Sequence, residues 1–148
     1  MTGDIDLVRR LVAADQGLAI VSTTRPDGSV HSSLVNAGVI DHPVTGEPVV
    51  ALVARGGAHK LKLFAAAGRA NAVFRAGWEW VSVEGPVDII GRDHPHAGFP
   101  PEGVPQLLRD IFMAAGGTHD NWPEYDRVMA EERRTAVFIT PARITTNG

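Results

Sequence analysis

Residues 17–40 constrain the fold more than any other part of the sequence, because they have the pattern of a long β-hairpin. The segment GLAIVSTT, residues 17–24, is rich in β-branched residues, which favour strands. RPDG, residues 25–28, places proline and glycine where a tight turn prefers them. SVHSSLVNAGVI, residues 29–40, has the composition of a returning strand. The hairpin favours a largely antiparallel sheet.

Four further segments have the composition of strands, and short helices lie among them. The strands are predicted at residues 49–54, 71–76, 79–91 and 135–140. The helices are predicted at residues 4–14, at residues 59–67, from Pro105 and from Pro123, since proline favours the first helical position. This order lacks regular βαβ units. It predicts a mainly β (α+β) fold, a six-stranded, largely antiparallel barrel with helices packed outside.

The composition sets limits on the class of protein. A chain of 148 residues with 44% hydrophobic residues is expected to form one domain, residues 1–148, with an ordinary core. The formal net charge of −3 indicates no nucleic-acid or anionic-membrane partner. No run of 18 apolar residues and no signal-peptide pattern occurs, so a cytoplasmic location is expected. The absence of cysteine excludes disulfides, thiolate metal sites and cysteine nucleophiles.

The stretch ARGGAHKLK, residues 54–62, is a candidate anion site. Arg55 and Lys60 flank two glycines between a hydrophobic strand and a predicted helix. Glycines allow close approach of the backbone, and a helix start presents free N–H groups and a positive dipole end. With two cations added, the turn could receive a phosphate or a carboxylate. The alternative is a solvated basic turn without a ligand.

The segment WEWVSVEG, residues 78–85, indicates a strand with two different faces. Val81 and Val83 suit the core, which places Trp78 and Trp80 on the opposite face beside polar residues. Large aromatic side chains in such a position indicate a subunit interface or a stacked ligand. The alternative is that a helix covers them.

The histidines and serines do not form a convincing catalytic set. His94 and His96 lie two apart in a loop without an evident third metal ligand. His31 and Ser32 point to opposite faces of a strand, which argues against a nucleophile and its base. His119, at a helix boundary, suits a capping or packing role. We therefore predict no metal site and no catalytic side chain.

Several segments in order resemble the pyridoxamine 5'-phosphate oxidase-like split-barrel family. Within it they are similar to the actinobacterial branch of F420-dependent flavin/deazaflavin oxidoreductases. The segments that carry the resemblance are STTRPDGSVHSSLVNAG, VVALVARGGAHKL, WEWVSVEGPVDIIG, LLRDIFMAAGGTHDNWPEYDRVMAEERR and AVFITPARI. They span most of the chain, and their order is more specific than any one of them.

The resemblance implies a homodimeric split barrel with cofactor sites at the subunit interface. It implies an oxidoreductase that transfers a hydride from reduced coenzyme F420 to a small organic acceptor. An FMN-binding enzyme of the same fold and a non-catalytic carrier or sensor are the alternatives. The implied cofactor-binding residues are Ser32, Ser33, Asn36, Ala51, Val53, Arg55, Ala58, Lys60, Trp78 and Trp80. In this interpretation Arg55 and Lys60 hold the cofactor's phosphate and acidic tail, and the two tryptophans lie near the partner subunit.

Overall fold

The structure, a computed structural model, describes residues 2–147 and contains seven strands. The strands are β1 (Leu18–Thr24), β2 (Val30–Asp41), β3 (Pro48–Ala54), β4 (Arg69–Ala76), β5 (Glu79–Ile90), β6 (Thr135–Ile139) and β7 (Arg143–Thr146). The six predicted strands are confirmed. The sequence analysis missed β7, which is too short for a clear alternating pattern and is held by pairing with β5.

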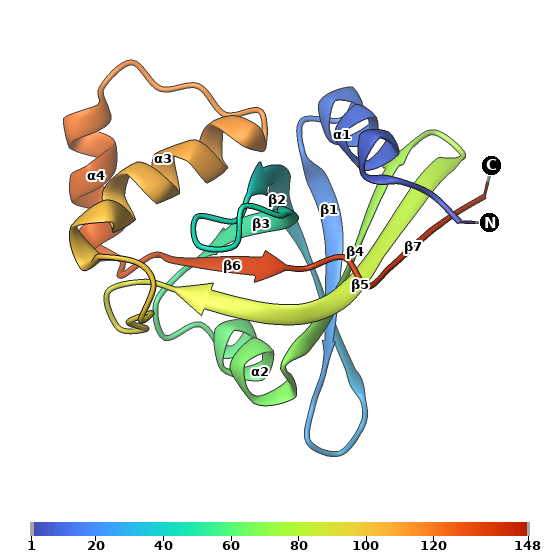
Figure 1. Ribbon diagram of the computed structural model, residues 1–148, viewed down its shortest axis with the longest axis horizontal. Coiled ribbons are helices and arrows are strands. Elements are labelled where there is room, and N and C mark those ends of the chain that lie inside the picture. Colours follow the sequence, from blue (N-terminus) through green and yellow to red (C-terminus); the bar gives the residue numbers. More distant parts are fainter. Residues whose placement is uncertain (1, 148) are drawn as a thin grey trace.

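Six of the strands form a closed antiparallel barrel (Figure 1). Neighbouring strands pair in the order β4-β1-β2-β3-β6-β5, and the β4–β5 pairing closes the ring. The β1–β2 hairpin has the predicted form, with Thr24 opposite Val30 and a tight turn between them. At the turn Gly28 has φ +86°, a left-handed conformation that glycine adopts without strain.

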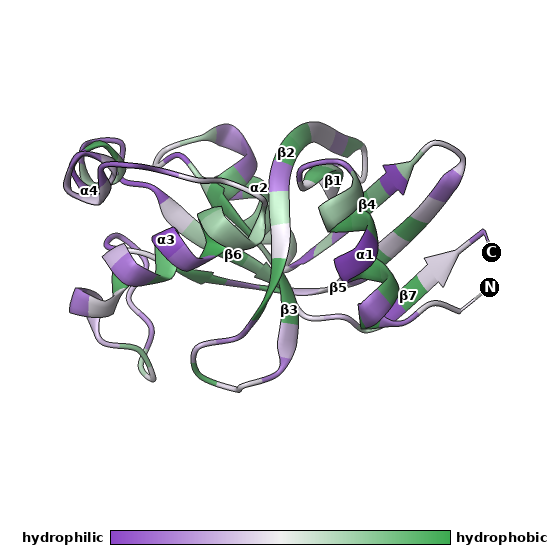
Figure 2. Ribbon diagram, turned by 90° about the horizontal axis from the view of Figure 1, so that it is seen from above, coloured by the Kyte–Doolittle hydropathy of each residue, from purple (hydrophilic) through white to green (hydrophobic). Residues whose placement is uncertain are grey.

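The barrel interior forms the main hydrophobic core. Strand alternation directs one face of each strand inward, including Val21 of β1, Leu52 of β3, and Val81 and Val83 of β5, all 0–1% exposed. The predicted inward position of the two β5 valines is thus confirmed. Apolar residues follow the inner strands and the helix faces that contact them (Figure 2).

Two helices lie at opposite ends of the barrel (Figure 1). Helix α1 (Ile5–Ala14) begins at Asp4, whose carboxylate accepts the Leu7 N–H at 2.9 Å. Its apolar face enters the main core, as does that of α2 (His59–Ala67), which ends at Gly68 in a left-handed conformation. Both helices agree with the sequence prediction.

The other two helices cover the outside of the barrel on one side. Helix α3 (Val104–Ala114), preceded by the short 3-10 turn η1 (Pro101–Gly103), packs against β2, β3 and β6. Its buried residues meet Ala51 of β3 and Phe138 of β6 in a second core. Helix α4 (Trp122–Glu131) lies against α3 (Figure 1). Within the described chain no helix has the length and apolar character needed to cross a membrane.

The outer face of β1, β4, β5 and the first half of β2 carries exposed apolar side chains. Ile20, Val30 and Leu34 are 45%, 59% and 62% exposed. Trp80 lies on this face beside Ser82, whereas Trp78 lies in the β4–β5 turn and is 92% exposed. Trp78 is therefore not covered by a helix, which was the alternative considered for the two tryptophans.

Candidate functional site

The turn between β3 and α2 is shaped by its two glycines. Gly57 has φ +78°, and a Cβ atom on Gly56 would lie 2.5 Å from the Cβ of Arg133. A side chain at Gly56 is therefore excluded by the neighbouring strand connection. The turn leads into α2 at His59, where no side chain caps the first free N–H groups.

The pairing of β3 with β6 brings a second cation to this turn. Ala54 is opposite Thr135, and the Gly56 N–H donates to the Glu132 carbonyl at 3.0 Å. Arg134, the residue before β6, consequently lies close to Lys60. The pKa of Lys60 is lowered, first because partial burial disfavours the charged ammonium and second because the Arg134 guanidinium repels it.

These two cations border a groove between the barrel and the outer helices. Its floor comes from β2 and β3, one end from the start of α2, and the opposite wall from α3 and α4. The groove holds about 820 Å³ of space, part of it open to solvent. The residues that line it are Leu34, Val35, Asn36, Val53, Lys60, Ile111, Phe112, Ala115, Tyr125, Met129 and Arg134. None of these described lining residues is acidic.

Aromatic side chains pack against one another in the helical wall of the groove. Tyr125 packs on Phe112 with ring centroids 5.1 Å apart, and its hydroxyl donates to the Leu108 carbonyl at 3.1 Å. Burial raises the pKa of Tyr125 to about 12, so the phenol is neutral at physiological pH. His119 packs against Trp122 and accepts the Asn121 N–H at 3.0 Å, which confirms its predicted packing role.

Three of the predicted cofactor-binding residues meet in this groove. Asn36, Val53 and Lys60 come from β2, β3 and α2 and line the same space. The Asn36 amide donates to the Gln16 carbonyl at 2.9 Å, which fixes its orientation. Ala58 lies at the start of α2, and Arg55 is exposed in the turn before it, outside the groove lining.

The other predicted residues of β2 and β3 lie around the groove without lining it. The Ser32 hydroxyl lies on the outer face, 2.8 Å from that of Ser22. The Ser33 hydroxyl is buried and has no hydrogen-bond partner within residues 2–147. Ala51 is fully buried beneath α3.

Trp78 and Trp80 lie apart from the groove within one chain. Two strands, β4 and β1, separate β5 from β2 in the sheet order. Both tryptophans belong to the exposed side of the barrel that β1, β4 and β5 form, and neither lines the groove.

The sequence analysis did not assign Phe112, Tyr125, Met129 and Arg134 to the site. Their signal in the sequence is weak, because an aromatic or methionine residue on a helix is usually a core residue. Arg133 and Arg134 directly precede the last predicted strand, as Arg55 directly follows the third. Only the β3–β6 pairing shows that these two basic segments are neighbours.

A second polar cluster lies on β5, away from the groove. Asp88 Oδ2 is 2.9 Å from His42 Nε2 and 3.2 Å from His96 Nε2. His42 Nδ1 accepts the Val44 and Thr45 N–H groups, and His96 Nδ1 accepts that of Gly98. Each imidazole therefore carries its proton on Nε2 and donates it to the same carboxylate. The cluster anchors two loops to the barrel.

Comparison of the structure with solved structures identifies the fold. An F420 reductase matches with a TM-score of 0.60 and 13% identity over 90% of this chain and 93% of the other. A pyridoxamine 5'-phosphate oxidase-related, FMN-binding protein from Nostoc punctiforme matches with a TM-score of 0.62 and 10% identity, over 95% of this chain and 79% of the other.

A conserved hypothetical protein from Mycobacterium tuberculosis matches with a TM-score of 0.70 and 17% identity, over 99% of this chain and 85% of the other. No protein-family model matches the sequence, and no curated protein matches it either. The chain therefore has the split-barrel fold of pyridoxamine 5'-phosphate oxidase-like proteins, as its resemblance implied. At these identities the likeness concerns the fold alone.

Proposed function

We propose that the protein is a cytoplasmic oxidoreductase that transfers a hydride from reduced coenzyme F420 to a small organic acceptor. The observation that carries the proposal is the groove, which combines two cations, no acidic lining residue and an apolar helical wall. The same fold occurs in proteins described as an F420 reductase and as FMN-binding. These likenesses support a flavin-type cofactor.

The groove residues fit a planar cofactor with an anionic tail. Lys60 is half-buried without an anionic partner in the described chain, and beside it lies Arg134, whose guanidinium pairs with Glu132 at 2.9 Å and has further N–H groups for an anion. An anion bound between them would relieve their repulsion and favour the charged form of Lys60. Val53 and Leu34 offer apolar surface for a ring system, and Asn36 offers polar atoms at its edge.

The chain's own residues would bind and orient the cofactor and keep water from the reacting atoms. The deazaflavin ring, when bound, supplies the hydride chemistry. Tyr125 is a poor proton donor, because its hydroxyl is already bonded to Leu108 and its pKa is raised. Lys60 and Arg134 would hold the phosphate in place. No protein nucleophile is needed for this reaction class.

The alternative cofactor is FMN, which also carries a phosphate for Lys60 and Arg134. The F420 tail is longer and more acidic, so it would gain more from additional cations near the groove, such as the exposed Arg55. A titration of the purified protein with F420 and FMN, side by side in the same buffer, tests the ranking. We expect tighter binding of F420, weakening with salt; equal or tighter binding of FMN would reverse the ranking.

Turnover distinguishes an enzyme from a carrier or sensor. We expect a quinone, an enone or a tetrapyrrole to oxidise reduced F420 faster in the presence of the protein than in its absence. Absorbance of the reduced cofactor follows the reaction. Tight cofactor binding without acceleration for any acceptor would favour the carrier.

We also propose that two copies of the chain form a homodimer through the exposed face of β1, β2, β4 and β5. Ile20 and Leu34 would form apolar contacts there, with Trp80 on the same face and Trp78 at its edge. Light scattering at micromolar concentration should give twice the chain mass. Leu34→Asp should shift the protein toward the monomer, while Val44→Asp, at an exposed site in the β2–β3 loop, should not. A monomeric parent protein would refute the dimer.

A further inference from the structure

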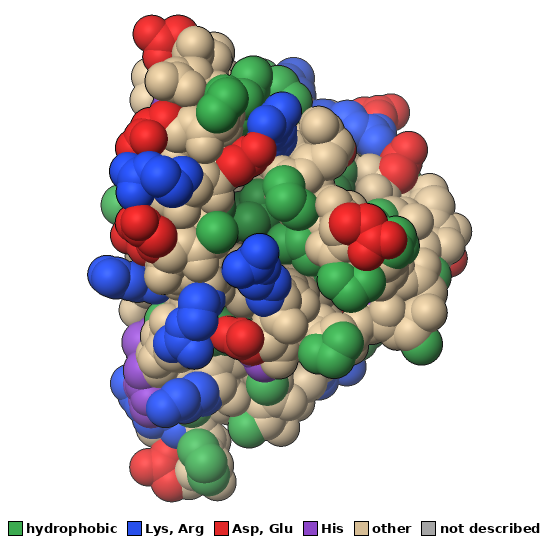
Figure 3. Space-filling model, turned by 90° about the vertical axis from the view of Figure 1, so that its left-hand side faces the viewer, with side chains coloured by type: hydrophobic (Ala, Val, Ile, Leu, Met, Phe, Trp, Pro, Cys, Tyr) green, Lys and Arg blue, Asp and Glu red, His purple; other side chains and the backbone are tan. Residues whose placement is uncertain are grey.

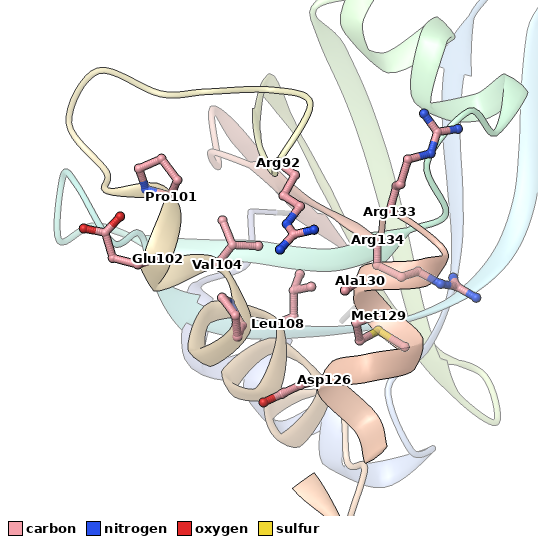
Figure 4. A pocket seen from close by; sticks show the side chains of 11 residues that line it. Arg92, Pro101, Glu102, Val104, Leu108, Asp126, Met129, Ala130, Arg133 and Arg134 are labelled. Atoms are coloured by element: carbon pink, nitrogen blue, oxygen red, sulfur yellow. The ribbon is translucent and has the colours of Figure 1, made fainter. Parts of the chain in front are cut away.

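A second, smaller cavity lies beside the groove, between α3, α4 and the loop of residues 91–103 (Figure 4). It holds about 510 Å³ of space, part of it open to solvent. Val104 and Leu108 are buried at its floor, and Met129 and Ala130 of α4 form a side. The remaining lining residues are Arg92, Pro101, Glu102, Pro105, Asp126, Arg133 and Arg134.

One arginine of this cavity differs from the others. The Arg92 side chain is exposed to solvent and points toward Val104 and Leu108 of the cavity (Figure 4). Within residues 2–147 its guanidinium has no hydrogen-bond or ion-pair partner. By contrast, Arg133 lies 3.3 Å from Asp93, and its guanidinium is directed away from the cavity (Figure 4). Arg134 is bonded to Glu132 at 2.9 Å.

The carboxylates at the rim of the cavity do not neutralise Arg92. Both oxygens of Asp126 accept from Arg109, at 2.9 and 2.5 Å. Glu102 is exposed and directed away from Arg92 (Figure 4). The cavity therefore combines one uncompensated guanidinium with an apolar floor. On this face of the molecule basic, acidic and hydrophobic side chains are interspersed (Figure 3).

We propose that this cavity binds a small monocarboxylic acid with a compact apolar body. A planar guanidinium pairs with a carboxylate through two parallel hydrogen bonds, a geometry that a lysine cannot offer. Val104, Leu108 and Met129 would take up the apolar body. The single uncommitted cation fits one carboxylate better than a di- or trianionic phosphate.

The site is separate from the groove and does not depend on the proposed cofactor. Met129 and Arg134 line both spaces, so they form the wall between them. An acid in the cavity would contact this wall from the side opposite the groove.

Calorimetric titration of the intact protein with benzoate and cyclohexanecarboxylate, beside benzamide as the uncharged match, tests the proposal. We expect saturable binding of both acids with Kd on the order of 1 mM or below, and at least tenfold weaker binding of the amide. Arg92→Gln should weaken acid binding by about tenfold or more. Ala130→Trp should abolish it, because the exposed Ala130 position allows an indole ring to fill the cavity.

Arg143→Gln is the matched control, since Arg143 is an exposed β7 arginine without a partner in the described chain and lies outside the cavity. It should bind acid like the parent protein. Circular dichroism should show that all three variants are folded. The proposal is overturned if the parent binds neither acid, if benzamide binds as tightly as benzoate, or if folded Arg92→Gln and Ala130→Trp proteins bind acid unchanged.

Discussion

Lys60 in the groove and His42 in the cluster on β5 are both basic side chains that are partly or fully removed from water. They differ in whether the surrounding protein provides them with partners. His42 is 4% exposed, and both of its ring nitrogens are used, one by Asp88 and the other by two backbone N–H groups. Lys60 is half-buried, has no anionic partner within residues 2–147, and is repelled by Arg134.

The difference separates a polar group that stabilises the fold from one that is suited to a ligand. A buried group with all its hydrogen bonds satisfied contributes to stability, and it offers nothing to a ligand. A partly buried cation beside a second cation disfavours the ligand-free state, and a bound anion removes that cost. Both are basic residues at a strand or helix boundary, so residue type and position do not distinguish them. What distinguishes them is that His42 has hydrogen-bond partners and Lys60 has no anionic partner in the described chain.

The largest expected effect is on stability at His42. His42→Ala leaves the Val44 and Thr45 N–H groups and the Asp88 carboxylate without their partner and opens a space beside Phe138. We expect a loss of about 3 kcal/mol in the free energy of unfolding, measured by urea denaturation. Cofactor affinity of the folded variant should stay unchanged.

His94→Ala is the control for this change. His94 lies in the same loop as His96, and its side chain has no partner in the described chain. A change within about 0.5 kcal/mol is expected there. If His42→Ala were as stable as His94→Ala, the cluster would not be the structural anchor inferred from its hydrogen bonds.

The next effect is on binding at Lys60. A charge-assisted hydrogen bond to a phosphate contributes about 1.5–3 kcal/mol, so Lys60→Ala should weaken cofactor binding about ten- to a hundredfold. The free energy of unfolding of Lys60→Ala should be unchanged or slightly larger, because the substitution removes a charge that Arg134 repels. Arg134→Ala should weaken binding similarly, and the double variant should fall short of the sum if both touch one phosphate.

Lys62→Ala is the matched control for Lys60→Ala, since Lys62 is exposed on α2 and does not line the groove. It should have a smaller effect on binding. Parent-like cofactor affinity in Lys60→Ala would mean that the turn of residues 55–58 is only a solvated connection.

The charge state of Lys60 should also appear in the pH dependence of binding. Its pKa in the ligand-free protein lies below the ordinary value of 10.5, and a bound phosphate favours the charged form. Cofactor affinity should therefore fall as the pH rises through the lowered pKa. Lys60→Arg should keep its affinity at that pH, because arginine remains protonated. Titrations between pH 7 and about 11 test this, and a parallel decline in both proteins would contradict it.

The smallest effect is expected at Tyr125, which lies in the groove but has a satisfied hydroxyl. Tyr125→Phe removes one neutral hydrogen bond and should cost about 1 kcal/mol of stability, with cofactor binding and turnover retained. A large loss of turnover would assign Tyr125 a catalytic role.

Tyr125 can be titrated directly because it is the only tyrosine in the chain. Ultraviolet absorbance should show phenolate formation near pH 12 in the folded protein. Because its pKa is raised above the unfolded value of about 10, its stabilising contribution is complete below pH 10 and is lost as the pH rises toward 12. In Tyr125→Phe the free energy of unfolding should not show this decrease between about pH 10 and pH 12.

Much of the fold follows from local patterns in the sequence. The hairpin of residues 17–40, the inward Val81 and Val83, and the cap at Asp4 each depend on neighbours a few residues away. Strand β7 was missed because its four residues have no pattern strong enough to specify a strand without β5 beside them. For the site, the sequence pointed to Asn36, Val53 and Lys60, and it left out the residues of α3 and α4.

The sequence by itself determined the helices, the strands β1 to β6, the inward face of β5 and the basic turn at Arg55–Lys60, because periodicity, glycines and caps act over short distances. Only the tertiary structure decided which cations are neighbours and which have partners. Lys60 and Arg134 are 74 positions apart, and closure of the barrel through the β3–β6 pairing is what brings their charges together. Likewise, His42 gains Asp88 and Arg92 lacks a carboxylate because of how loops fold back on the barrel. Electrostatic environment depends on distances in space, which the order of residues along the chain does not specify.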